Sequence, residues 1–232
     1  MQQPREHFKY LGFISSAIVA TLIISNVSAA KLVEIGPIIT DGGTLLFPLS
    51  YIFGDILTEV YGYSASRRVI YTAFFWMALA AIMFQFVAAM PAPAEQGDFA
   101  EMFGAVLSPV PSILVASLLG FFTGEFVNSY VLAKMKVWTA GRRLWTRTIG
   151  STAFGQLADT AVFYTVATVL NVFPSSTLLQ LIWDTYWIKV TIEVLFTPLT
   201  YQIVNWLKRN EGVDYYDIDT NFNPFAVDKL FE

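Results

Sequence analysis

The sequence contains no cysteine and a single histidine, His7. Without cysteine the chain can form no disulfide bond, no thiolate metal site and no cysteine nucleophile. His7 lies in a polar N-terminal segment, so histidine metal sites and serine–histidine–aspartate catalysis lack their central residue. A P-loop for ATP hydrolysis is missing as well. We therefore expect neither a metal site nor a cofactor, and we do not expect an enzyme.

Charged residues are scarce too. They make up 14% of the 232 residues, while 55% are hydrophobic, whereas soluble domains carry about 25% charged residues. The composition predicts an integral membrane protein. Apolar stretches of about 20 residues can cross a bilayer as helices, and the sequence has six, near residues 10–33, 44–63, 69–90, 109–135, 148–170 and 178–207. The predicted fold is an all-α integral membrane bundle of six transmembrane helices over residues 1–209, with a cytoplasmic tail at 210–232.

The basic residues predict an orientation for this bundle. The loops at 91–108 and 171–177 contain no lysine or arginine, and only Lys31 and Lys189 depart from a one-sided distribution. Because cytoplasmic loops carry an excess of basic residues, both termini are predicted to be cytoplasmic, in a multi-pass membrane protein. Within the outer loop, residues 98–107 fit either a short amphipathic helix or an ordered loop.

Polar residues recur inside the predicted spans. Asp55 and Glu59 lie four residues apart, on one face of a helix, and each acid costs about 2.5–3.5 kcal/mol at the centre of a membrane helix. Because polar groups come from five spans at similar depth, a shared mid-membrane cavity explains them better than unrelated polar residues in separate helices. We predict a substrate-binding cavity lined by Asn26, Tyr51, Asp55, Glu59, Glu125, Asn128, Gln156, Asp159, Tyr186, Lys189 and Glu193. Lys189 is expected to pair with Glu193 or with Asp55, whereas a plain hydrogen bond between helices explains Asn26 equally well.

A short pattern repeats along the chain. Phe53-Gly54-Asp55 resembles Phe154-Gly155-Gln156, and Gly124-Glu125 begins a third copy. The first two copies fall in the second and fifth predicted spans, which are the middle helices of two three-span halves. Such halves have opposite orientations, which favours a 3+3 inverted repeat with the site at its interface. Each glycine is expected to allow close packing of helices.

The predicted cavity is acidic and has aromatic neighbours. Carboxylates accept hydrogen bonds from planar N–H donors, and aromatic faces stack on flat rings. A cation, or a flat heterocycle rich in N–H donors, therefore fits this cavity better than an anion does.

Several short motifs lie between residues 10 and 207. They include Phe47-Pro48, Asp55-x-x-Thr58-Glu59, Gly124-Glu125-x-x-Asn128, Gly155-Gln156-x-x-Asp159-Thr160, Tyr186-x-x-Lys189 and Thr197-Pro198. In combination they resemble the queuosine-precursor transporter family. The resemblance implies an inner-membrane importer of 7-cyano-7-deazaguanine, 7-aminomethyl-7-deazaguanine or queuine, which supply the queuosine modification of tRNA.

The resemblance also suggests roles for the predicted site residues. Asp159 or Glu125 would accept hydrogen bonds from the N1–H and the 2-amino group of a deazaguanine. Gln156 and Asn128 would contact its carbonyl oxygen or a ring nitrogen. The candidates for gating or proton coupling are Asp55, Glu59, Glu193 and Lys189.

Two other functions stay open on the sequence alone. One is a substrate-binding subunit of an energy-coupling-factor-type vitamin transporter, which needs a partner. The other is an intramembrane enzyme that uses carboxylates such as Glu59 and Asp159 as acid and base. The expected partners are the lipid bilayer and a small purine-like substrate, without direct contact to nucleic acid. A homo-oligomer and an energising partner are both compatible with the sequence.

Overall fold

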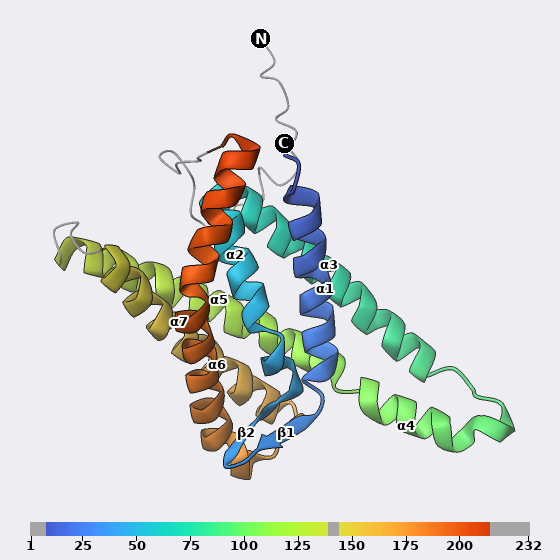
Figure 1. The fold of residues 1–232 in the computed structure, drawn as a ribbon. Helices are drawn as coiled ribbons and strands as arrows, with labels where there is room; N and C mark the ends of the chain where they lie inside the picture. Colours follow the sequence, from blue (N-terminus) through green and yellow to red (C-terminus); the bar gives the residue numbers. More distant parts are fainter. Residues whose placement is uncertain (1–7, 139–143, 214–232) are drawn as a thin grey trace.

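The computed structural model describes residues 8–138 and 144–213 (Figure 1). Its helices are α1 (Leu11–Ser28), α2 (Pro48–Tyr61), α3 (Tyr63–Ala88), α4 (Gly97–Leu107), α5 (Val110–Trp138), α6 (Leu144–Val169) and α7 (Leu178–Glu211). Two strands, β1 (Leu32–Ile35) and β2 (Ile38–Asp41), lie between α1 and α2. Short 3-10 turns are η1 (Gly42–Leu45), η2 (Ala94–Gln96) and η3 (Ser175–Thr177).

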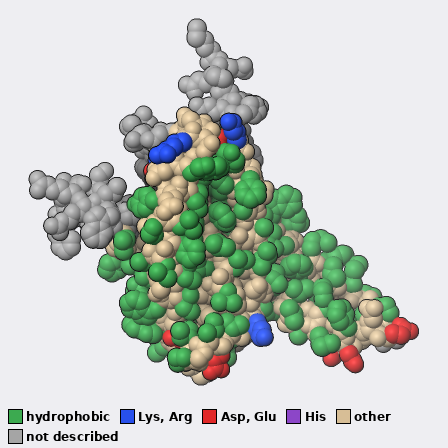
Figure 2. Space-filling view, viewed as in Figure 1, with side chains coloured by type: hydrophobic (Ala, Val, Ile, Leu, Met, Phe, Trp, Pro, Cys, Tyr) green, Lys and Arg blue, Asp and Glu red, His purple; other side chains and the backbone are tan. Residues whose placement is uncertain are grey.

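Three helical stretches of the described chain are long and apolar enough to cross a membrane, namely Leu11–Ser28, Ser64–Ala88 and Gly97–Gly124. They overlap the first, third and fourth predicted spans and support a helical membrane protein. Hydrophobic side chains cover most of the face seen in Figure 2, with basic side chains mainly at its upper end and acidic ones at its lower end. The remaining three spans and the orientation of the termini stay predictions.

The second predicted span, 44–63, is not one continuous helix. Its first residues belong to η1, and α2 begins only at Pro48, because proline suits the first turn of a helix. The helix ends before Gly62, which has a φ of 83°. Its 14 residues extend about 21 Å at 1.5 Å per residue, less than the hydrocarbon core of about 30 Å. α2 is therefore too short to cross a bilayer alone.

The all-α prediction is wrong for the segment between α1 and α2. β1 and β2 pair in antiparallel register, with Leu32 opposite Asp41. Gly36, with a φ of 62°, allows the tight turn between the strands. The N–H of Ile39 donates to Asp184 Oδ2 of α7 at 2.8 Å. This bond helps to hold the hairpin against α7, so β2 brings Asp41 into the interior.

α3 and α4 form an arm at the right of Figure 1. Gln85 Nε2 of α3 donates to the carbonyl oxygen of Leu107 at 2.8 Å, at the end of α4. Of the two alternatives for residues 98–107, the helix is confirmed.

α5 and α6 pack against each other closely (Figure 1). A Cβ atom on Gly124 would lie 2.7 Å from Asp159 Cβ, and one on Gly155 would lie 2.8 Å from Asn128 Cβ. Both distances are too short, so these positions need glycine for the helices to approach. Gly54, in contrast, has nothing within 4 Å of where its Cβ would be. The predicted packing role is therefore confirmed for Gly124 and Gly155 and wrong for Gly54.

Two apolar clusters flank the middle of the molecule. One joins α1, α2 and α3 around Ile56, Leu57 and Val60. The other joins α5, α6 and α7 around Tyr164 and Leu181. The hairpin and η1 lie between these clusters, and the candidate site lies beside them.

The start of α1 and the end of α7 are joined by Glu211. Its carboxylate accepts hydrogen bonds from the N–H groups of Lys9 and Tyr10 and from the hydroxyl of Tyr61, each at 2.8 Å. Burial opposes ionisation of Glu211, but these donors outweigh it, and the pKa of its carboxyl lies below the usual range. This end of the bundle is closed by a contact between α1, α2 and α7.

Candidate functional site

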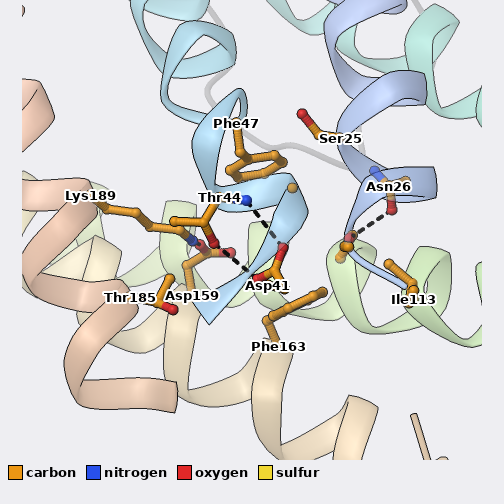
Figure 3. Close-up of a pocket in the computed structure, with 13 residues that line it drawn as sticks. Ser25, Asn26, Asp41, Thr44, Phe47, Ile113, Asp159, Phe163, Thr185 and Lys189 are labelled. Carbon is orange, nitrogen blue, oxygen red and sulfur yellow. Dashed lines mark hydrogen bonds and ion pairs between the residues drawn. The ribbon is translucent and has the colours of Figure 1, made fainter. Parts of the chain in front are cut away.

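A small cavity lies where β2 ends and α2 begins (Figure 3). Its volume is about 30 Å³, which is room for one or two water molecules. Side chains from α1, the hairpin, η1, α5, α6 and α7 surround it. They include Ser25, Asn26, Asp41, Thr44, Phe47, Ile113, Ser117, Asp159, Phe163, Thr185 and Lys189. In Figure 3, Phe47 and Phe163 lie on opposite sides of Asp41.

A buried ion pair forms one wall of the cavity. Lys189 Nζ on α7 lies 2.7 Å from Asp159 Oδ2 on α6, and their side chains are 6% and 8% exposed. Lys189 also lies over the ring of Phe47, 5.0 Å from its centroid. Asp159 reaches this position because Gly120 and Gly124 of α5 leave space beside it. The expected pairing of Lys189 with Glu193 or Asp55 is wrong, because Asp159 is the acid that α6 brings to the lysine.

A ring of hydrogen bonds forms beside this pair, around Asp41. Its Oδ2 atom lies 2.5 Å from the Tyr164 hydroxyl and 2.9 Å from Thr44 Oγ1. Thr40 Oγ1 lies 2.9 Å from Thr44 Oγ1 and 2.8 Å from Thr185 Oγ1. Thr185 Oγ1 lies 2.7 Å from the Tyr164 hydroxyl, which closes the ring. All five residues are buried, so the ring ties the hairpin to α6 and α7.

The sequence analysis missed Asp41 because it falls between two predicted spans. The signal was the Asp-x-x-Thr pattern, in which an aspartate caps the turn that follows. The structure shows this cap, since the N–H of Thr44 donates to Asp41 Oδ1 at 3.1 Å.

Asn26, one of the predicted site residues, lines the cavity. Its Oδ1 accepts from Ser117 Oγ at 3.1 Å, and its Nδ2 donates to the carbonyl oxygen of Leu22 at 2.9 Å. Nδ2 also lies 3.1 Å from the sulfur of Met77 on α3. Asn26 therefore forms a bond between helices and also faces the cavity.

Comparison with known proteins identifies the kind of molecule that carries this cavity. The family model described as "Putative vitamin uptake transporter" matches residues 41–203, more than half of the chain. The chain belongs to this family. The match begins at Asp41 and includes the Asp159–Lys189 pair. Because the family consists of transporters, the protein is a membrane transporter and not an enzyme.

Similar proteins carry names of the same kind. A protein of Bacillus subtilis (strain 168) named "Probable queuosine precursor transporter" is 25% identical over 205 residues, which cover 88% of this chain and 86% of that protein. The "Queuosine precursor transporter" of Escherichia coli (strain K12) is 23% identical and covers 87% of this chain and 90% of its own length. A Haemophilus influenzae protein named "Probable queuosine precursor transporter" is 25% identical over 72% of this chain and 69% of its own. No solved structure matches the chain.

A second polar group in the transporter lies next to the cavity along α6 and α7. Gln156 Nε2 donates to Glu193 Oε2 at 3.3 Å. Among the described residues, Gln156 Oε1 and Asn128 Oδ1 are buried without a hydrogen-bond partner. These three predicted residues do not line the cavity itself, but Gln156 and Glu193 lie about one helical turn from Asp159 and Lys189.

Asp55 and Glu59 lie away from the cavity, contrary to prediction. Both residues are exposed, and Glu59 pairs with Lys208 near the end of α7, at 2.6 Å. The cavity lies at the start of α2, so Asp55 is about 12 Å along the helix from Phe47. The sequence analysis placed these two residues near the middle of the membrane by counting along one continuous helix from residue 44. The chain is not α-helical before Pro48, so that count does not give their depth.

The other predicted site residues have mixed outcomes. Tyr186 is half-buried, packs on Trp187 with ring centroids 5.4 Å apart, and does not line the cavity. Tyr51 and Glu125 lie in α2 and α5, but their side chains fall outside the part of the chain that the structure describes.

Proposed function

We propose that this transporter imports queuosine precursors of the 7-deazaguanine type across the cell inner membrane. The observation that carries the proposal is the family match over residues 41–203 together with three relatives named as queuosine precursor transporters. These relatives align with 72–88% of the chain, and the family match over residues 41–203 includes Asp41, Asp159 and Lys189 of the cavity.

The chemistry of the cavity supports a flat, hydrogen-bonding base. Asp159 offers carboxylate oxygens to an edge with N1–H and 2-amino donors, in the planar arrangement that favours paired bonds. Asn26 and Ser117 offer an amide and a hydroxyl on the opposite wall. Phe47 and Phe163, which lie on opposite sides of Asp41 in Figure 3, would then stack on the faces of the ring.

The cavity is narrow at this position. A volume of about 30 Å³ holds water but not a purine-sized ring. In the proposed cycle, Phe47 moves aside and Lys189 releases Asp159 when the base enters. The Asp159–Lys189 pair then acts as a gate, because the base and the lysine compete for the same carboxylate.

Binding to the purified protein in detergent tests the proposal. Calorimetry with the three 7-deazaguanines should show saturable binding, with guanine and adenine binding more weakly. Asp159→Asn should weaken binding at least tenfold, or by about 1.4 kcal/mol. The amide oxygen of asparagine can accept a hydrogen bond, but its NH2 group cannot, so one of the two bonds to the base is lost. The matched control is Asp98→Asn at an exposed position of α4.

Two results would count against the proposal. Failure of folded wild-type protein to bind any 7-deazaguanine would remove the substrate class. Wild-type affinity in Asp159→Asn would remove the base-edge role from this carboxylate. Uptake into liposomes that contain this chain alone would exclude dependence on an ATPase partner.

A further inference from the structure

We infer that Asp41 binds a positively charged amino group of the substrate, so that the transporter prefers 7-deazaguanines that carry an ammonium group. The inference rests on the proposed function and adds a residue that discriminates among its three candidate substrates. At neutral pH 7-aminomethyl-7-deazaguanine carries a primary ammonium and queuine carries a secondary one, whereas the 7-cyano compound has an uncharged nitrile at this position.

The Asp41 side chain accepts every hydrogen bond that it forms. Its Oδ2 atom accepts from the Tyr164 hydroxyl at 2.5 Å and from Thr44 Oγ1 at 2.9 Å, and its Oδ1 atom accepts from the N–H of Thr44 at 3.1 Å. An ionised carboxylate behaves in this way and has about four acceptor positions on its two oxygens. Since these three donors occupy three positions, an acceptor position is left for a ligand.

The three donors to Asp41 are all uncharged. In the part of the chain that the structure describes, no lysine or arginine forms an ion pair with this carboxylate, and Lys189 lies beside Asp159 instead. Asp41 is 5% exposed, and a buried charge without an opposite charge is costly. An ammonium group on the ligand would supply the opposite charge.

Ser25 of α1 is an independent sign of a missing ligand. It lines the same cavity and is 1% exposed, and its hydroxyl has no hydrogen-bond partner among the described residues. A Cβ atom on Gly43 would lie 2.8 Å from Asp41 Oδ1 and 2.4 Å from the carbonyl oxygen of Ser25, so Asp41 and Ser25 meet at this glycine. An alkyl ammonium has N–H donors and no acceptor, and these two residues offer it a carboxylate and a hydroxyl oxygen.

The positions of Asp41 and Asp159 suit a ligand that contacts both. Asp41 is bonded to Tyr164, whose hydroxyl lies 2.7 Å from Thr185 Oγ1, while Asp159 is bonded to Lys189. Thr185 and Lys189 are four residues apart on α7, which is about 6 Å along a helix. In a deazaguanine the N1–H edge and the 7-substituent belong to different rings of a fused pair, which spans a comparable length. A base bound by Asp159 through its N1–H and 2-amino group can therefore extend its 7-substituent toward Asp41, and both carboxylates are labelled in Figure 3.

The uncharged member of the series fits this position less well. A nitrile nitrogen accepts hydrogen bonds and donates none, so it would meet the Asp41 carboxylate with lone pairs on both sides. An ammonium at the same place forms a charge-assisted hydrogen bond, which is stronger than a bond between neutral groups. The cavity should therefore bind the 7-aminomethyl compound more tightly than the 7-cyano compound.

Two variants test this preference. Asp41→Asn removes the charge and keeps the size of the side chain. Ser25→Ala removes a hydroxyl without a partner, so it should leave the fold intact and keeps the inference testable if Asp41→Asn does not fold. Asp98→Asn on α4 is the matched control for the aspartate change.

Calorimetry at neutral pH measures the ratio of the two affinities. Wild-type protein and Asp98→Asn should bind the 7-aminomethyl compound at least tenfold more tightly than the 7-cyano compound. Asp41→Asn should bring this ratio close to one, and Ser25→Ala should lower it severalfold. Equal affinities in the wild type, or a ratio that stays the same in Asp41→Asn and Ser25→Ala, would overturn the inference and leave the proposed function intact.

A different result would refute the proposed function, namely a folded wild-type protein that binds neither deazaguanine. Benzylamine and benzonitrile then serve as probes, because they carry an ammonium and a nitrile on a plain aromatic ring. An increase in the unfolding temperature of the wild type with benzylamine only, which is absent from Asp41→Asn, would support the ammonium site. Equal responses to both probes, or no response, would overturn it.

Discussion

The Asp159–Lys189 ion pair forms one wall of the cavity and also contains the carboxylate that is proposed to bind the substrate. Each charge is nearly inaccessible to water, so each depends on the other for stability. The same carboxylate is the proposed acceptor for the substrate. The pair therefore has to be stable enough to keep the empty cavity closed, yet replaceable by a ligand with N–H donors.

Breaking this pair should be far more destabilising than breaking an exposed one. We expect Lys189→Met to lower the free energy of unfolding by about 3–5 kcal/mol, because the buried Asp159 carboxylate loses its lysine partner. Adding Asp159→Asn to Lys189→Met should restore much of that loss. Thermal unfolding of the single and double variants in detergent measures this coupling.

The Glu59–Lys208 pair supplies the matched control. The Glu59 side chain is 61% exposed, and exposed pairs contribute about 0–1 kcal/mol. Lys208→Met should therefore change the free energy of unfolding by less than about 1 kcal/mol. Equal effects of Lys189→Met and Lys208→Met would show that Asp159 and Lys189 are not buried together.

At the scale of elements, α5 and α6 are related by a reciprocal contact. Gly124 of α5 faces Asp159 of α6, and Gly155 of α6 faces Asn128 of α5. In each helix the glycine and the polar residue are four apart, so the two copies of the pattern meet across an antiparallel crossing. The repeat thus places Asp159 beside the cavity through packing. The wider 3+3 inverted repeat stays a prediction.

Glycine-to-alanine changes test this crossing. Gly124→Ala and Gly155→Ala should each destabilise the protein by about 1–3 kcal/mol, because the added methyl group overpacks the interface. Gly54→Ala should be neutral or stabilising by about 0.5–1 kcal/mol, since alanine is the better helix former and space is open there. Thermal unfolding in detergent compares the three variants, and a loss of stability limited to Gly54→Ala would contradict the packing described.

At the scale of the whole molecule, two features restrict the proposed path of a substrate. The cavity is too small for its proposed substrate, and Glu211 joins α1, α2 and α7 at the end of the bundle that is predicted to be cytoplasmic. In the proposed transport cycle, the cavity and the Glu211 contact open in turn. A hairpin tied to α6 and α7 by side-chain hydrogen bonds is suited to such a movement, because these bonds can break without unfolding a helix.

The predicted orientation can be measured directly, since the natural chain contains no cysteine. In intact cells, a membrane-impermeant thiol reagent should label Gln96→Cys and Ser176→Cys, which are exposed in the predicted outer loops. It should label Asn210→Cys, an exposed position at the end of α7, only after the cells are permeabilised. Labelling of Asn210→Cys in intact cells would reverse the predicted topology.

The sequence alone was sufficient for the class of the protein and for three of the residues that line the candidate site. Low charge and long apolar stretches predict a helical membrane protein, because a helix satisfies its own backbone hydrogen bonds in lipid. Asn26, Asp159 and Lys189 were found in the same way, since polar groups inside apolar stretches are costly and need partners. These inferences depend only on composition and on the spacing of nearby residues, and both can be read directly from the sequence.

Only the tertiary structure decided which acids meet which partners. Asp41 is close to α6 and α7 because a hairpin folds back between α1 and α2, and no local pattern specifies that return. Asp55 and Glu59 lie outside the cavity because α2 begins late, at Pro48, which shifts the depth of every residue that follows. Pairing across helices depends on the depth and rotation of each helix, and both are set by packing contacts between residues far apart in the chain.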